Sequence, residues 1–418
     1  MKQVTLKTLD EEFFRRDDAE EIASVKPLLA DVRKRGDAAV RELTERFDKV
    51  RLDRFEVSKE EIKDAYKEVG AEAIAAIKAA AENIREFAKA QFSQLKSFEI
   101  RRNGARLGQR VIPLERVGCY VPGGGYPLPS TALMTVIPAK VAGVKEVIIC
   151  SPKIVPSTIV AADIAGADKI YQIGGVQAIA AMAYGTETIP RVDKIVGPGN
   201  AYVTAAKKEV YGLVGIDFLA GPSEVLIIAD ETGDAEIIAA DLLAQAEHDV
   251  NARADLITTS ETVAQAVSKA LIPQLAKLKT RDIAQQSIDK GRIILVEKLS
   301  EAFELANKRA PEHLELFVSN PEKGVPSLTS YGSLFIGENS AEVFGDYGST
   351  GTNHVLPTNG AARYMGGLSV KEYVKILTYQ QVDEKIEQSL IDIAATLADV
   401  EGLYAHKAAA LARQKNAR

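Results

Sequence analysis

The chain contains no tryptophan and only two cysteines, Cys119 and Cys150, among its 418 residues. Without tryptophan, an aromatic cage built on indole is excluded. The two cysteines have no paired spacing, which favours reduced thiols in a reducing compartment over a disulfide framework. Residues 1–22 mix charges of both signs and contain no apolar stretch, so we expect no signal peptide and a cytoplasmic protein.

Long apolar runs and an excess of positive charge are also missing. No apolar run approaches the ~18 residues that a membrane-spanning helix needs. The formal net charge is −6, and acidic and basic residues are interspersed, so the chain lacks the basic face that binds nucleic-acid phosphates. The 46% hydrophobic content is ordinary for a globular protein, and the length allows two or more domains. We therefore expect neither a membrane nor a nucleic acid as partner.

Two patterns of apolar residues divide the chain. Apolar positions at three- and four-residue steps predict helix across residues 18–97. Further along, short apolar runs that end in turns are typical of buried strands, and alanine-rich helical stretches separate them. These candidate strands lie at 145–152, 168–175, 193–200, 223–231, 254–261, 291–298, 313–320 and 332–339. Alternating strands and helices predict an α/β fold with mainly parallel sheets, built as two units of similar character.

The C-terminal residues 384–414 return to a helical pattern. Such a tail can dock on a partner subunit or pack on its own chain, and the residues alone leave both arrangements open. Glu401 and His406 lie in this tail, five residues apart. That spacing does not place them on one narrow helix stripe, so it favours a solvated helix face.

The chain has only four histidines, all in its second half: His248, His313, His354 and His406. Each has an acid or an amide close by, and histidine is the usual metal ligand and proton carrier near neutral pH. Gln245 lies three residues before His248 on a predicted helix, so both side chains can reach one metal ion. The simpler alternative for His248 is a polar residue at a helix end.

Two further segments carry acids beside histidines. Glu312 and His313 stand at the mouth of an apolar strand, where a carboxylate and an imidazole suit general base and general acid roles. Asp346 and His354 lie in a glycine-rich loop, and loops of this kind position functional groups on a rigid scaffold. Taken singly, each pair also occurs in proteins without such a function.

Together, these segments could supply mixed nitrogen and oxygen ligands for one zinc ion and leave room for a substrate. The four donors would be Gln245, His248, Asp346 and His406. Glycine-rich turns at 115–134 and 195–210 offer backbone amides to a phosphate or a dinucleotide, although neither matches the spacing G-x-G-x-x-G. Ser223 offers a hydroxyl at a strand entrance, and we expect Cys119 to be an inert buried thiol.

Nine segments, in order, resemble the histidinol dehydrogenase family, and the similarity runs from about residue 10 to residue 410. They are GCYVPGG, PAKVAGVKEV, GGVQAIAAMAYGTETIP, DKIVGPGNAYV, AGPSEVLIIADE, LLAQAEH, APEHLEL, GDYGSTGTNHVLPT and EGLYAH. The resemblance implies a homodimer of two incomplete Rossmann-like domains, with helical N- and C-terminal extensions and sites shared between subunits. The implied divisions are an N-terminal arm at 1–20, a first α/β domain at 21–117 and 225–365, a second at 118–224, and a helical tail at 366–418 that docks on the partner subunit.

The same resemblance implies a role for each candidate residue. Glu312 would activate water, and His313 would be the second acid–base group. The zinc ligands would be Gln245, His248, Asp346 and His406. The substrate would contact Ser223, Gln245, His248, His313, Asp346, His354, Glu401 and His406. NAD would contact Tyr120, Gln177 and Asn200. His354 and the tail would reach the site of the partner subunit.

The implied reaction is the oxidation of L-histidinol to L-histidine through the aldehyde, with zinc, two NAD and one water. Three alternatives remain at this point. A paralogue could act on another alcohol such as sulfopropanediol, since residues 361–380 also resemble those relatives. A zinc hydrolase could use Glu312 to activate water without redox chemistry. A non-catalytic binding module could hold a structural metal with four closed ligands.

Overall fold

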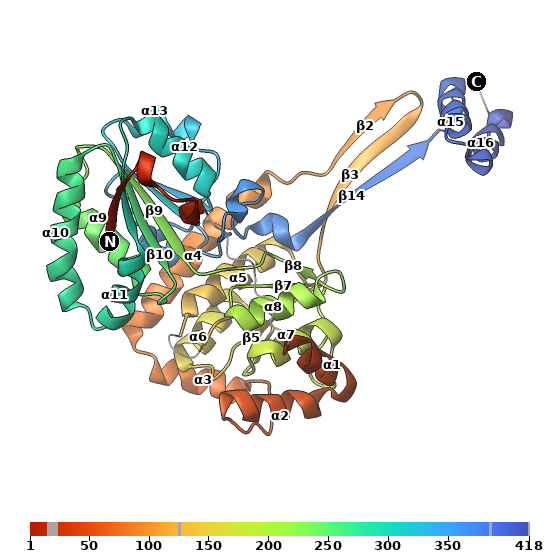
Figure 1. The fold of residues 1–418 in the computed structure, drawn as a ribbon. Coiled ribbons are helices and arrows are strands. Elements are labelled where there is room, and N and C mark those ends of the chain that lie inside the picture. Colours follow the sequence, from red (N-terminus) through yellow and green to blue (C-terminus); the bar gives the residue numbers. More distant parts are fainter. Residues whose placement is uncertain (15–23, 124–126, 384–386, 417–418) are drawn as a thin grey trace.

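The computed structural model describes residues 1–14, 24–123, 127–383 and 387–416. Two parallel sheets with helices packed on them form the body, and an antiparallel arm extends from it to carry the C-terminal helices (Figure 1). This architecture confirms the predicted α/β class with mainly parallel sheets and helical ends. In the described parts of the chain, none of the helices combines the length and apolar character that crossing a bilayer requires.

Sheet A has six parallel strands in the order β1-β11-β10-β9-β12-β13. They are β1 (Lys2–Thr5), β9 (Glu224–Ala229), β10 (Arg253–Thr258), β11 (Arg292–Leu295), β12 (His313–Phe317) and β13 (Ser333–Ile336). Its helices are α9 (Ala235–Ala246), α10 (Glu261–Lys277), α11 (Arg281–Lys290), α12 (Leu299–Arg309), α13 (Pro321–Gly324) and α14 (Glu342–Asp346). Apolar clusters cover both faces, one under α9–α11 and one under α12. Burial on both faces explains why a central strand such as β9 is a nearly continuous apolar run, whereas the edge strand β1 is mostly exposed.

Sheet B has five parallel strands in the order β6-β5-β4-β7-β8. They are β4 (Arg116–Tyr120), β5 (Glu146–Cys150), β6 (Lys169–Tyr171), β7 (Lys194–Val196) and β8 (Gly215–Ile216). Its helices are α5 (Pro129–Ala142), α6 (Pro156–Ala165), α7 (Gly175–Tyr184) and α8 (Ala201–Val210). All eight strands predicted from apolar runs exist, five in sheet A and three in sheet B.

The helical N-terminal region packs mainly on sheet B. It consists of α1 (Val25–Arg35), α2 (Asp37–Asp48), α3 (Lys59–Glu68) and α4 (Ala71–Ser93). α1 and α2 pack against α7, and α3 packs against α6. We expected residues 21–117 to pack with 225–365, so α1–α3 differ from that expectation. The expected helix start before residue 24, and residues 124–126 of the glycine loop, lie outside the described residues.

The projecting arm joins two distant segments of the chain. β2 (Phe98–Arg102), β3 (Ala105–Pro113) and β14 (Val374–Val382) form an antiparallel sheet in the order β14-β3-β2. β14 leads to α15 (Gln388–Val400) and α16 (Tyr404–Leu411) at the far end of the arm (Figure 1). The segment 366–418 was expected to be helical throughout, but it begins with this strand because β14 pairs along the whole of β3.

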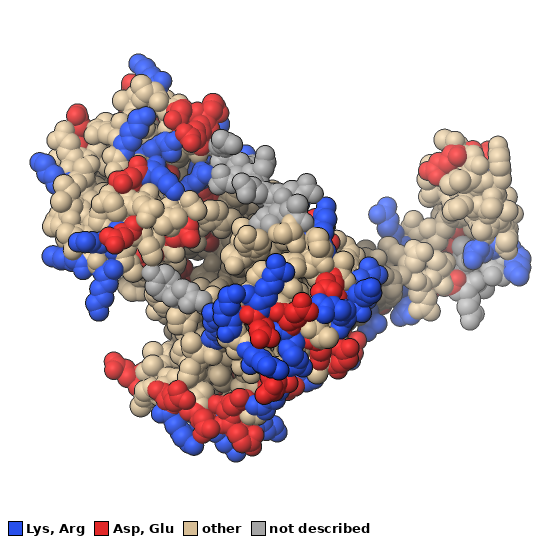
Figure 2. Space-filling model, turned by 60° about the horizontal axis from the view of Figure 1, so that its bottom comes forward, with Lys and Arg blue, Asp and Glu red and all other residues tan. Residues whose placement is uncertain are grey.

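Large apolar side chains are exposed along the arm and its helices. They are Phe98, Ile100, Ile376, Leu377, Tyr379, Val382, Ile393, Leu397, Val400, Leu403, Tyr404 and Leu411. Figure 2 shows wide uncharged areas on this projection, whereas acidic and basic residues intermingle on the visible face of the body. An apolar surface of this extent is typical of a protein–protein contact.

Candidate functional site

The predicted acid–base residues lie at the amino end of sheet A. Glu312 directly precedes β12 and His313 begins it, and both are buried, with 5% and 4% of their surfaces exposed. The neighbouring strand β9 begins at Glu224, and His313 pairs in register with Val225. The parallel register therefore places Glu224 beside both predicted residues.

Hydrogen bonds to the peptide of Glu224 orient this pair. The backbone N–H of Glu224 donates to Glu312 Oε2 at 3.0 Å, and His313 Nδ1 lies 3.2 Å from the Glu224 carbonyl oxygen. A carbonyl can only accept, so Nδ1 carries the proton of that bond, and Nε2 is the nitrogen at which the ring gains or loses its other proton. His313 Nε2 has no hydrogen-bond partner among the described residues and lies 3.5 Å from Asp346 Oδ1.

The surroundings shift the proton affinities of these groups strongly. Burial raises the pKa of Glu312 to about 8, although the nearby His313 and the Glu224 N–H act in the opposite direction. Burial lowers the pKa of His313, but the carboxylates of Glu312, Asp346 and Glu342 outweigh it and hold the pKa well above its usual range. Burial opposes ionisation of Asp346 as well, yet the imidazole of His313 keeps its pKa below the ordinary value. Strong shifts of this kind cluster at functional sites.

Several polar side chains deeper in the site lack partners. Gln245, at the end of α9, is 1% exposed, and neither of its amide atoms has a hydrogen-bond partner among the residues that the structure describes. Both carboxyl oxygens of Glu342 also lack a hydrogen-bond partner among the described residues. Glu342 Oε2 lies 3.8 Å from His313 Nδ1. Glu315 and Asp241 are buried as well, and each has one carboxyl oxygen without a hydrogen-bond partner among the described residues. Buried polar atoms normally find partners, so this group marks a place built to meet another group.

The predicted zinc ligands are only partly brought together by one chain. Asp346 lies beside His313, Gln245 is buried near the end of α9, and the exposed His248 follows α9 closely enough for its charge to act on Asp346. His406 lies on α16 at the end of the arm, away from this site (Figure 1). Within the described ranges, no three His, Cys, Asp or Glu side chains of one chain form a metal cluster. The amide, carboxylate and imidazole donors fit the chemistry of a catalytic zinc site that lacks one ligand.

His354 belongs to this site through its own chain. Its Nδ1 lies 2.6 Å from the backbone oxygen of Asp346, and its Nε2 lies 3.0 Å from Thr131 Oγ1 on α5. Burial lowers its pKa. The ring of His354 is therefore held between two segments of its own chain, and its expected reach to the site of a partner subunit stays a prediction.

The three predicted NAD residues lie together at the carboxyl end of sheet B. Tyr120 ends β4, Gln177 lies in the first turn of α7, and Asn200 caps α8 by accepting a hydrogen bond from the Val203 N–H at 3.1 Å. The Tyr120 hydroxyl accepts the Gly175 N–H at 3.1 Å. Strand ends and helix N-termini at this edge are where α/β sheets receive phosphates and dinucleotides.

The remaining predicted residues divide between the body and the arm. Ser223 directly precedes β9 and is partly exposed beside Glu224. Glu401 caps the end of α15 and His406 lies in α16, and both side chains are exposed. One chain therefore does not bring Glu401 and His406 to Glu312 and His313.

Four buried acids around the pair were not predicted from the sequence. Glu224, Asp241, Glu315 and Glu342 are each no more than 6% exposed. The available signal was an acidic residue within or beside an otherwise apolar run, as in β9 and β12, because charged residues are rarely buried without a reason.

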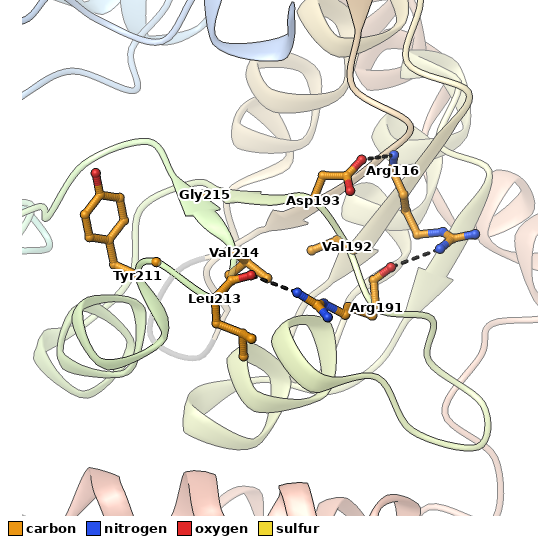
Figure 3. Close-up of a pocket in the computed structure, with 9 residues that line it drawn as sticks. Arg116, Arg191, Val192, Asp193, Tyr211, Leu213, Val214 and Gly215 are labelled. Atoms are coloured by element: carbon orange, nitrogen blue, oxygen red, sulfur yellow. Dashed lines mark hydrogen bonds between the residues drawn. The ribbon is translucent and has the colours of Figure 1, made fainter. Parts of the chain in front are cut away.

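A separate groove of ≈ 570 Å³ lies at the opposite, amino end of sheet B (Figure 3). Its two arginines are already bound, because Arg191 Nη2 donates to the Leu213 oxygen and Arg116 Nη1 donates to the Arg191 oxygen, both at 2.9 Å. None of the predicted site residues lines it. The groove is therefore distinct from the candidate site.

The fold and the site define an α/β enzyme with a buried acid–base pair. The family model described as histidinol dehydrogenase matches residues 14–414. The histidinol dehydrogenase of Methanocaldococcus jannaschii is 48% identical over 99% of this chain and 98% of its own, and that of Geobacillus kaustophilus is 48% identical over 93% and 92%. The crystal structure of histidinol dehydrogenase from Elizabethkingia anophelis matches with a TM-score of 0.94 and 40% identity, covering 99% of this chain and 98% of that one.

The chain belongs to the histidinol dehydrogenase family, and it is an oxidoreductase. The predicted resemblance is confirmed over nearly the whole chain. Membership in a family of oxidoreductases decides against a zinc hydrolase and against a non-catalytic binding module.

Proposed function

We propose that the chain oxidises L-histidinol to L-histidine through the aldehyde, using zinc and two NAD, as a cytoplasmic homodimer. The observation that carries this proposal is the buried pair of Glu312 and His313, with His313 Nε2 3.5 Å from Asp346 Oδ1. Among the described residues, neither this nitrogen nor the buried amide of Gln245 has a hydrogen-bond partner. Two free, buried thiols support a reducing compartment.

The proposed chemistry assigns one proton transfer to each member of the pair. His313 takes the proton of the substrate hydroxyl at Nε2, the nitrogen that its bond to Glu224 leaves free. Glu312 then removes a proton from the water that adds to the aldehyde. Zinc held by Gln245, His248, Asp346 and a partner's His406 would orient the substrate, and NAD would accept hydride. Enclosure of the pair keeps bulk water from the aldehyde.

A substrate assay tests this proposal directly. The purified protein with zinc and NAD is offered L-histidinol and, separately, sulfopropanediol, and NADH absorbance is followed. We expect two NADH for each histidine formed. Turnover of sulfopropanediol with no turnover of histidinol would instead support the paralogue.

We propose that the arm completes the site of a second copy. His406 and Glu401 lie at its end, and the arm exposes a broad apolar surface. In the described part of one chain, no three His, Cys, Asp or Glu side chains gather to hold a metal. Asp346→Asn and His406→Asn should each abolish activity as pure dimers. In a mixed dimer, one site carries both changes and the other carries neither, so random mixing should restore about a quarter of wild-type activity. Absence of any recovery after verified exchange would contradict shared sites.

A further inference from the structure

The side chain of Glu224 is held by an ion pair that neither predicted catalytic residue takes part in. One of its carboxyl oxygens accepts from the guanidinium of Arg309, at the end of α12, and the other accepts from the backbone N–H of Asn359 at 2.9 Å. The side chains of Glu224 and Arg309 are 4% and 3% exposed. Arg309 in turn stacks over the buried ring of Phe13, 5.8 Å from its centroid.

A pair buried this deeply is not explained by stability alone. Removing two charges from water costs more than their attraction returns in many proteins, and well-packed apolar residues often replace such pairs without loss. The placement of this pair suggests another reason. It anchors the residue whose backbone N–H binds Glu312 and whose backbone carbonyl binds His313.

We propose that Glu224 and Arg309 are positioning residues that set the orientation of Glu312 and the tautomer of His313. The ion pair fixes the amino end of β9 from the side of α12 and the Asn359 turn. The fixed backbone of Glu224 then directs the Glu312 carboxylate and keeps Nδ1 of His313 as the donor to its carbonyl, so that Nε2 is the nitrogen that exchanges a proton. This inference rests on the acid–base roles proposed above for Glu312 and His313.

The most informative variant removes both charges at once, because Glu224 without Arg309 would be a buried, uncompensated charge that destabilises the fold. Glu224→Gln/Arg309→Met keeps side chains of similar size. We expect kcat with histidinol to fall about 100-fold, because a catalytic group misplaced by about 1 Å loses about that much rate. The KM for NAD should be unchanged. Loss of the hydrogen bond to Glu312 should also move the acidic limb of the kcat profile by about one pH unit to higher pH. Arg309→Lys keeps a cation and should fall between wild type and the double variant.

A second ion pair in the same chain provides the control. Lys194 on β7 bonds Glu372 at 2.5 Å, with side chains 14% and 24% exposed, and neither residue touches the site. Lys194→Met/Glu372→Gln makes the same chemical change away from the site and should leave kcat and its pH profile unchanged. If both double variants change kcat and the pH profile alike, the Glu224–Arg309 pair is merely structural and the inference is wrong.

A readout without turnover separates this inference from the proposed function. With only four histidines in the chain, ¹⁵N-labelled imidazoles can be resolved, and His313→Gln assigns the signal. We expect a hydrogen-bonded Nδ1–H for His313 in the wild type and its loss in Glu224→Gln/Arg309→Met. If the wild type does not oxidise histidinol but this signal behaves as expected, the proposed function fails and the positioning role stands. If the wild type is active and the signal is unchanged in the variant, the positioning role fails.

Discussion

Sheets A and B have the same parallel architecture, yet their polar groups gather at opposite ends. In sheet A, Glu224, Glu312 and His313 lie at the amino ends of β9 and β12, with buried acids of α9 and α14 beside them. In sheet B, Tyr120 and the starts of α7 and α8 lie at the carboxyl ends of the strands. Carboxyl ends are the usual ligand sites of open α/β sheets, so sheet B follows the general rule and sheet A departs from it.

The two ends also differ in the kind of group they present. The end of sheet A presents ionisable side chains whose pKa values are displaced by burial and by each other. The end of sheet B presents backbone amides, a phenol and carboxamides. This difference suggests that sheet A carries the proton chemistry and sheet B carries cofactor binding. Each prediction below changes one sheet and expects an effect of one kind only.

The largest effect should come from Glu312→Gln. Because burial raises the pKa of Glu312 to about 8, the wild-type rate should increase with pH through that region as the carboxyl loses its proton. The variant should lose about 10²- to 10⁴-fold in kcat, the usual contribution of a general base, and should lose this pH dependence. The affinity for NAD, measured by calorimetry, should be unchanged.

Glu304→Gln on α12 is the matched control, since it makes the same chemical change at an exposed position on sheet A. It should retain wild-type kcat. If the rate of Glu312→Gln still increases with pH in this region, Glu312 is not the group that accepts the proton.

A smaller effect, on binding, is expected from Asn200 in sheet B. Asn200→Ala should raise the KM for NAD about 10-fold, the equivalent of one lost hydrogen bond, while kcat changes little. The substitution also removes a helix cap worth about 1 kcal/mol. Asn200→Asp keeps an acceptor for the cap, and it separates recognition of the cofactor from stability of α8.

Asp234→Ala tests the same cap loss in sheet A, where Asp234 accepts from the N–H groups of Glu236 and Ile237. It should cost similar stability without changing the KM for NAD. If Asp234→Ala and Asn200→Ala raise the KM for NAD equally, the proposal that only sheet B binds the cofactor is wrong.

The buried acids of sheet A should appear in the pH dependence of stability. Burial, and then the charge of Asp241, raise the pKa of Glu315 above its ordinary value of 4.5. A carboxyl with a raised pKa in the folded state favours folding at pH below 4.5, and this contribution is lost as pH rises through the folded pKa. Glu315→Gln, which mimics the protonated form, should therefore gain at least about 1 kcal/mol over wild type at pH 9 and much less at pH 5.

Thermal unfolding of both proteins across this pH range measures the difference. Glu60→Gln, at an exposed position on α3, should show no such trend. A constant difference between Glu315→Gln and wild type would mean that Glu315 does not change its protonation in this pH range, which contradicts the prediction.

The sequence predicted eight strands of the body because burial makes them short apolar runs. It missed β1, which is mostly exposed, and the two-residue β8, and it treated the segment of β4 only as a glycine-rich turn. The arm escaped prediction because β3 and β14 mix polar residues with exposed apolar ones, and their pairing joins residues 105–113 to 374–382. In the candidate site, too, neighbours in the chain could be predicted and contacts between distant segments could not. Glu312 and His313 were visible as neighbours in the chain, whereas the contacts of Glu224 with Arg309 and of His354 with Asp346 depend on distances that only the fold sets.

The smallest effect should come from the thiols of sheet B. Cys119 on β4 and Cys150 on β5 are fully buried, and burial raises the pKa of Cys119 to about 12 and raises that of Cys150 as well. A thiol that stays protonated and enclosed does not attack disulfide reagents. The native protein should therefore release no chromophore from a disulfide reagent and keep full activity, whereas the denatured chain should react at both cysteines. Rapid reaction of either thiol in the folded protein, with loss of turnover, would mean that the interior of sheet B supplies a reactive group and is more than a scaffold for binding.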